Sequence, residues 1–140
     1  MGDNEHIVLQ LCRGTFGPGV PSAAVMGNIA VETGFSFDYT QKQYGGGPGR
    51  GLFQMEKGMM ASYNSFLAET KMTDSAASQI AFAQHELKHG TFIGAGNAKK
   101  IRDAFASGDV VEATTRFCEL FERPGIPHLD KRIAAAKKYL

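Results

Sequence analysis

The stretch that decides the fold reads Pro21-Ser22-Ala23-Ala24-Val25-Met26-Gly27-Asn28-Ile29-Ala30-Val31-Glu32-Thr33-Gly34. Proline suits the first turn of a helix, and the side chains that follow it are apolar on nearly every side. Because such a helix has no polar face to turn toward water, we expect it to lie buried at the centre of the domain. Its first strongly polar side chain, Glu32, comes in the final turn, just before a glycine that suits a helix end.

Apolar residues recur at helical spacing on both sides of this stretch. They predict one helix before it, at residues 4–13, and further helices at residues 59–71, 74–89, 97–106, 109–122 and 128–139. Residues 35–55 lack this periodicity, and the glycine-rich run 45–51 separates two short pieces that favour an irregular β-hairpin or loop. The expected fold class is therefore mainly α (α+β), with any β structure confined to this insert.

Composition limits the classes of protein to which the chain can belong. Its 140 residues suffice for one hydrophobic core, so a single domain over residues 1–140 is expected. A net charge of +1 without a basic cluster argues against nucleic-acid binding. No apolar run is long enough to insert into a membrane. Residues 1–5 are acidic where a secretory signal would be basic, so we expect no export by a leader of its own.

The position of Glu32 makes it the first candidate for chemistry. A carboxyl group in the last turn of an apolar helix meets the negative end of the helix dipole and partial desolvation, and both disfavour ionisation. A carboxylic acid that keeps its proton suits the protonation of a glycosidic leaving group. The alternative interpretation is a solvated helix-end residue without a catalytic role.

Two motifs separated by the glycine-rich insert resemble a known family. Residues 28–35 read Asn-Ile-Ala-Val-Glu-Thr-Gly-Phe, and residues 51–55 read Gly-Leu-Phe-Gln-Met, which is expected to form a strand. Together they resemble the phage tail lysozyme family of the lysozyme-like superfamily. Later landmarks of that family follow in order: Gln79-Ile80-Ala81-Phe82, Glu86-Leu87, Phe121-Glu122-Arg123-Pro124 and a closing helix that contains Arg132. The resemblance covers residues 20–140.

The resemblance implies a single lysozyme-like catalytic domain that acts on the glycan strands of peptidoglycan without a cofactor. In this interpretation Glu32 is the general acid that protonates the oxygen between N-acetylmuramic acid and N-acetylglucosamine. Gln54 matches the glutamine on the floor of the saccharide cleft, where its amide binds a sugar or holds the attacking water. The resemblance also implies a phage origin. The protein would then belong to a virion or tail, with tail proteins as partners, or lie in the host cytoplasm until released to the wall.

Other side chains are weaker candidates for substrate binding. The aromatic rings of Tyr44, Phe53 and Tyr63 would face sugars or pack in the core. Asp38, at the mouth of the insert, is a candidate base or electrostatic stabiliser, and Glu56 follows the Gly51–Met55 motif. Neither carboxylate matches a fixed family position. Hydrolysis and lytic transglycosylation of the same bond therefore both stay open.

A rival motif predicts a different class of enzyme. His85-Glu86-Leu87-Lys88-His89 is a literal H-E-x-x-H on a predicted helix, as in zinc peptidases. The extended pattern with a downstream glycine and a third histidine fails, because Phe92 and Ala95 occupy those positions. We therefore expect no metal site.

A non-catalytic domain is the remaining alternative. A wall-binding or tail structural domain could keep the lysozyme-like fold without turnover. The presence of both Glu32 and Gln54 argues against this interpretation.

Overall fold

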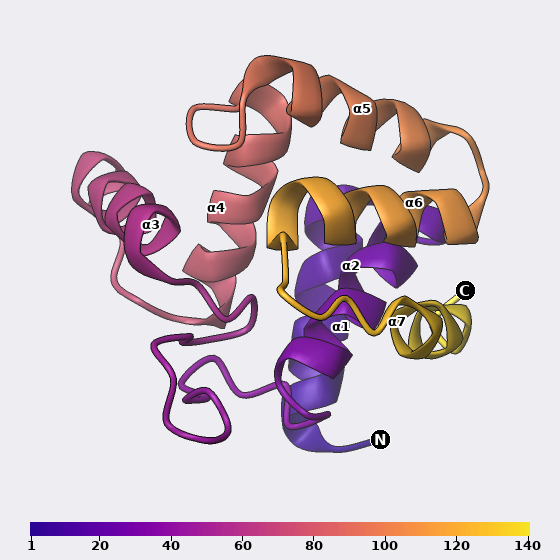
Figure 1. The fold of residues 1–140 in the computed structure, drawn as a ribbon, viewed down its shortest axis with the longest axis horizontal. Helices are drawn as coiled ribbons and strands as arrows, with labels where there is room; N and C mark the ends of the chain where they lie inside the picture. Colours follow the sequence, from indigo (N-terminus) through magenta and orange to yellow (C-terminus); the bar gives the residue numbers. More distant parts are fainter.

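A computed structural model describes all residues, 1–140, and shows seven α-helices and one short π-helix (Figure 1). In chain order these are α1 (Asp3–Phe16), α2 (Val20–Glu32), α3 (Lys57–Thr70), α4 (Ala76–His89), α5 (Ala95–Ala106), α6 (Val110–Phe117), η1 (Cys118–Glu122) and α7 (Leu129–Lys137). The predicted mainly α architecture is thereby confirmed. No helix has both the length and the apolar character needed to cross a bilayer.

Helix α2 is the centre of the structure. Every residue from Ser22 to Ala30 is buried, and the helix packs against α1, α5, α6 and α7. Figure 1 shows α2 behind α6, with the insert and α3 on one side and α7 on the other. The absence of a polar face in this sequence is explained by these neighbours, and the predicted buried central helix is confirmed.

The contact between α2 and α7 is close because α2 carries Gly27 at the crossing. A Cβ atom placed on Gly27 would lie 2.7 Å from the Cβ of Ala136 and 2.8 Å from its backbone nitrogen. Only a residue without a side chain allows the two helices to approach this closely. This approach brings Arg132 of α7 alongside the carboxyl-terminal half of α2.

The helix predicted over residues 109–122 is present, but it consists of an α-helical part followed by a π-helical part. Asp109 caps α6 by accepting hydrogen bonds from the backbone of Val111 (2.9 Å) and Glu112 (3.2 Å). The Glu112 carboxylate binds Arg116 (2.9 Å), and the backbone N–H of Asp109 donates to the hydroxyl of Ser107 (3.1 Å). After Phe117 the helix widens into the π-helix η1, which no apolar periodicity predicted.

The insert between α2 and α3 contains no β-strand. Two isolated antiparallel bridges, Lys42 with Arg50 and Arg50 with Met55, are its only β pairing. The expectation of a strand at Gly51–Met55 was wrong, since these residues form turns and Gln54 has a left-handed φ of 49°. Four of the five residues in this segment are buried. Buried and exposed side chains therefore do not alternate as they would in a strand with one exposed face. Of the two forms predicted for the insert, an irregular β-hairpin or a loop, the structure shows the loop.

Candidate active site

A pocket of about 360 Å³ lies where the end of α2, the insert and the segment after η1 meet. Its walls are mostly polar. The residues that line it are Val31, Glu32, Gln43, Tyr44, Gln54, Glu56, Glu122, Arg123, Pro124, Gly125 and His128. The structure therefore brings together Glu32, Gln54 and Tyr44 from the set of predicted site residues.

The end of α2 fixes the position of Glu32. The backbone N–H of Phe35 donates to the carbonyl of Ala30 (2.7 Å), and that of Gly34 donates to Val31 (3.3 Å). These two bonds are those of a Schellman motif, with Gly34 in the left-handed conformation at a φ of 60°. Glu32 is thus the last helical residue, and its carboxyl group faces the pocket at the start of the insert.

Gly34→Ala is expected to destabilise this corner by about 1–2 kcal/mol and to lower activity, because alanine is strained at a positive φ. A Cβ on Gly34 would also lie 2.8 Å from the ring of Tyr44, which lines the pocket. Urea unfolding and a lysis assay measure the two effects. Gly14→Ala is the matched control, since Gly14 lies within α1 with open space around it. Equal stability and activity of Gly34→Ala and the wild type would contradict the assigned geometry.

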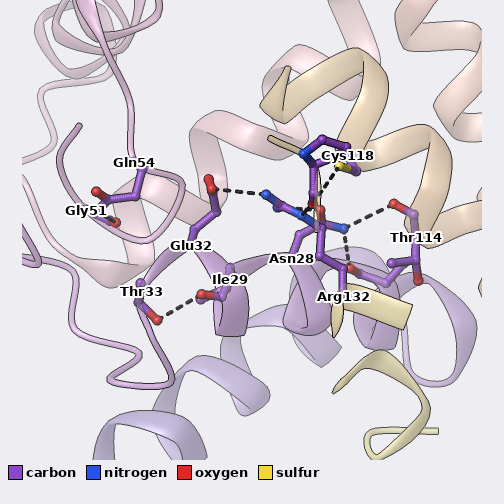
Figure 2. Close-up of polar contacts among 11 residues, drawn as sticks. Asn28, Ile29, Glu32, Thr33, Gly51, Gln54, Thr114, Cys118 and Arg132 are labelled. Atoms are coloured by element: carbon purple, nitrogen blue, oxygen red, sulfur yellow. Dashed lines mark hydrogen bonds and ion pairs between the residues drawn. The ribbon is translucent and has the colours of Figure 1, made fainter. Parts of the chain in front are cut away.

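Glu32 forms an ion pair with Arg132 of α7, whose side chain is 1% exposed (Figure 2). The guanidinium Nη2 donates to Glu32 Oε1 at 3.2 Å, and the Glu32 side chain is 15% exposed. The expectation drawn from the helix end alone did not include this partner, which places a buried positive charge beside the carboxyl group.

Arg132 is held by two acceptors besides Glu32. Its Nη1 donates to Asn28 Oδ1 (3.0 Å) and its Nε to the carbonyl of Pro127 (2.6 Å). Asn28 in turn donates to the carbonyls of Ala24 (2.9 Å) and Thr114 (3.3 Å). Figure 2 shows Arg132, Asn28 and Thr114 on the side of Glu32 that faces away from Gln54. Because each nitrogen of the guanidinium donates a hydrogen bond, the group presents a fixed positive charge to the carboxyl group.

A second carboxyl group, that of Glu122, lies beside Glu32. Both of its side-chain oxygens are shielded from solvent, and neither has a hydrogen-bond partner. Desolvation raises the pKa of Glu122 well above 4.5, and the like charge of Glu32 raises it further, while Arg132 lowers it in part. Burial and the neighbouring carboxylate therefore favour the neutral form of Glu122 beside the Glu32–Arg132 ion pair.

Gln54 presents an unused acceptor at the pocket. Its Nε2 donates to the carbonyls of Gly51 (2.8 Å) and Gln41 (3.0 Å), which fixes the orientation of the amide. Its Oε1 accepts no hydrogen bond within the chain and remains available to a hydroxyl group or a water molecule. Tyr44 is 65% exposed, and its hydroxyl donates to the carbonyl of Thr33 (3.3 Å).

The structure places three other sequence candidates away from this pocket. Asp38 closes a turn, where its carboxylate accepts from the backbone N–H and hydroxyl of Thr40, and these bonds lower its pKa. Tyr63 and Phe53 are each 2% exposed and pack in the core. The hydroxyl of Tyr63 binds Asp74 at 2.6 Å. The burial of both rings favours the core alternative over sugar stacking.

The H-E-x-x-H motif lies on α4, and its glutamate is already engaged. Glu86 is buried and accepts hydrogen bonds from the backbone of Phe92 (2.8 Å) and Ile93 (3.0 Å) and from the hydroxyl of Thr91 (2.6 Å). No set of three potential ligand side chains forms around the two histidines. Glu86 therefore organises the turn after α4, and this geometry does not favour the zinc peptidase alternative.

Sequence reasoning assigned no role to Arg132 or Glu122, although both stand in segments that it quoted. One signal for Glu122 was present, since it comes four residues after Cys118 and directly after Phe121, on the apolar side of the helical pattern. Arg132 similarly comes three and four residues before Ala135 and Ala136, which places it on the same face of the helix as these apolar residues. A charged residue in such a position is either paired or functional.

One of three comparisons with known proteins finds a match. The model of the phage tail lysozyme family matches residues 19–140. No curated protein and no solved structure matches the chain. Because the match covers all of α2, the insert and the helices that follow, the chain belongs to the phage tail lysozyme family.

Proposed function

We propose that the protein cleaves the β-1,4 bond between N-acetylmuramic acid and N-acetylglucosamine in peptidoglycan, with Glu32 as the general acid. One observation carries this proposal. In a member of the phage tail lysozyme family, the helix-terminal Glu32 lies in a polar pocket of about 360 Å³ that the insert helps to form. Pockets that bind small ligands typically have volumes of about 300–1,000 Å³.

The chemistry requires a proton for the leaving oxygen. Glu32 is the one pocket carboxyl group that is partly exposed and held by a fixed partner, so it can reach a bound glycan without losing its orientation. The expected step breaks the bond between the anomeric carbon and the bridging oxygen, and Glu32 supplies the proton that this oxygen takes up.

The attack on the anomeric carbon has two candidate helpers. The free Oε1 of Gln54 can hold a water molecule, and Glu56, which is exposed at the end of the insert, can accept its proton. We propose hydrolysis with these two residues as the main reaction. Attack by a hydroxyl group of the sugar itself would give lytic transglycosylation instead.

Analysis of the products tests the proposal directly. Purified peptidoglycan is digested with and without a chelator, and the soluble fragments are identified by mass spectrometry. Reducing N-acetylmuramic acid ends, unaffected by the chelator, are the expected result. Anhydro-muramyl ends would retain the bond and the acid but replace hydrolysis by transglycosylation. Intact glycans with cut stem peptides, or sacculus binding without any released sugar, would reject the proposal.

We also propose that the protein acts from a phage tail. The support is the family, which is described as phage tail lysozyme. Mass spectrometry of purified virions of the source phage provides the test. Detection of the chain in tails after density-gradient purification is expected, and detection only in the lysate would reject this location.

A further inference from the structure

Glu122 has no structural partner that explains its burial. It is the last residue of the π-helix η1, where the N–H of Arg123 bonds back to the carbonyl of Cys118 at 2.8 Å. The widened turn places Glu122 at the wall of the pocket, yet neither carboxyl oxygen reaches solvent or a donor. A buried acceptor without a donor costs free energy that an apolar residue would avoid. π-Turns of this kind often occur at functional sites.

The groups around Glu122 come from every neighbouring element. Its carboxyl group interacts with Glu32 of α2, Arg132 of α7 and Cys118 of its own helix. The pocket wall adds four further titratable or charged groups, which are Glu56, Tyr44, Arg123 and His128. Arg132 is the buried cation among them, and it already binds Glu32. Two carboxyl groups thus share one buried positive charge.

Charge balance therefore allows only one of the two carboxyl groups to be ionised. If both were ionised, one guanidinium would face two adjacent negative charges in a site largely closed to water. With a single proton between them, Glu122 and Glu32 can hydrogen bond to each other, and the bond supplies the donor that Glu122 otherwise lacks. The two residues then titrate as a coupled pair.

We propose that Glu122 stores the proton that Glu32 delivers to the glycosidic oxygen, a role that rests on the function proposed above. As the bond to the anomeric carbon breaks, the single proton passes from Glu122 to Glu32 and from Glu32 to the leaving oxygen. Both carboxyl groups are then ionised beside Arg132 while the sugar carries the positive charge of the oxocarbenium-like transition state. The water that adds to the anomeric carbon releases one proton, which returns to the pair. Glu122 acts through Glu32 and is a positioning residue that does not touch the sugar.

The first test measures stability and does not depend on activity. A carboxyl group whose pKa is raised on folding contributes stability below its unfolded pKa of about 4.5, and this contribution is lost as pH rises through the folded pKa. The urea midpoint of the wild type is therefore expected to fall between pH 4.5 and pH 8. In Glu122→Gln this part of the decrease is expected to vanish. Glu122→Leu is a second variant in case the amide impairs folding.

The second test is the pH profile of the initial rate at low peptidoglycan concentration. Without Glu122, no neighbouring buried carboxyl group holds a proton for Glu32 as pH rises. The alkaline limb of Glu122→Gln is expected to move toward acid, with at least about a tenfold loss at pH 8 that is largely recovered near pH 5. Glu119→Gln, an exposed residue of the same π-helix, is the matched control and should leave the profile unchanged.

The outcomes separate this inference from the proposed function. Equal losses at every pH, or a urea midpoint with the same pH dependence in Glu122→Gln and the wild type, would overturn proton storage by Glu122. That result would leave Glu32 as the acid. A wild-type protein without glycosidase activity would reject the proposed function, while the stability test of the Glu122 proton would still stand.

Discussion

Glu32→Gln is expected to reduce peptidoglycan hydrolysis by roughly 10²- to 10⁴-fold, the contribution typical of a general acid. Glutamine keeps the shape of the side chain and can still accept a hydrogen bond from Arg132, which lies 3.2 Å away. It cannot supply a proton to the leaving oxygen. The loss should therefore appear in the rate of bond cleavage, with binding to the sacculus retained. Release of soluble muropeptides and co-sedimentation with sacculi measure the two quantities.

A matched substitution separates this chemical effect from a general loss of charge. Glu119→Gln makes the same change at an exposed position of η1 and is expected to retain full activity. Circular dichroism at the assay temperature should show both variants folded. Full lytic activity in a folded Glu32→Gln protein would remove Glu32 from the role of acid. The conclusion drawn from the pocket would then be wrong.

The helical part of the fold could be predicted because each helix has a local signal. The run from Ala23 to Val31 has no polar face, and burial on all sides is the only environment that suits it. The segment Gly51–Met55 was misjudged for a related reason. Short apolar runs look like strands, but here the apolar side chains are buried through turns whose geometry depends on tertiary contacts, such as the bond from the backbone of Leu52 to Gln79 (2.9 Å).

The candidate site was predictable only where a residue and its role lie in one local motif. Glu32 stands at a recognisable helix end, and Gln54 stands in a motif that resembles the family. Arg132 lies 100 residues from Glu32 in the sequence, and their contact exists only because Gly27 lets α7 approach α2. The environment of Glu122 likewise depends on a π-turn. The spacing of apolar residues within one segment cannot indicate contacts between segments that are far apart in the sequence.

The same distant contact changes the expected chemistry of the acid. Helix dipole and desolvation alone would keep a carboxyl group neutral at the end of α2. Arg132 places a buried guanidinium 3.2 Å from Glu32, and in our proposal a further group stores the proton needed for catalysis. Glu122 is a neighbouring carboxyl group that burial keeps neutral. The helix-end signal thus nominated Glu32 alone, while the proposed storage of its proton also involves Glu122 of η1 and Arg132 of α7.

Arg132→Met is expected to cause the largest loss of stability, about 3–5 kcal/mol, because it removes one partner of a buried ion pair and leaves the other in place. The change also leaves Asn28 Oδ1 and the carbonyl of Pro127 without the donor that each now has. For a domain of this size the melting temperature should fall by roughly 10–20 °C. Urea unfolding with a fitted m-value measures the change. Arg116→Met is the matched control, since its pair with Glu112 is about half exposed and should contribute at most about 0.5 kcal/mol.

Combining Arg132→Met with Glu32→Gln separates the ion pair from the rest of the network. Once Glu32 is neutral, loss of the guanidinium no longer leaves an uncompensated carboxylate, so the double variant should lose less stability than the sum of the single variants. The difference is expected to be about 1–3 kcal/mol, whereas the same cycle at the exposed pair of Arg116 and Glu112 should give only a few tenths. Additive losses would show that Arg132 stabilises the fold through Asn28 and Pro127 alone. In that case its charge would have no part in setting the state of Glu32.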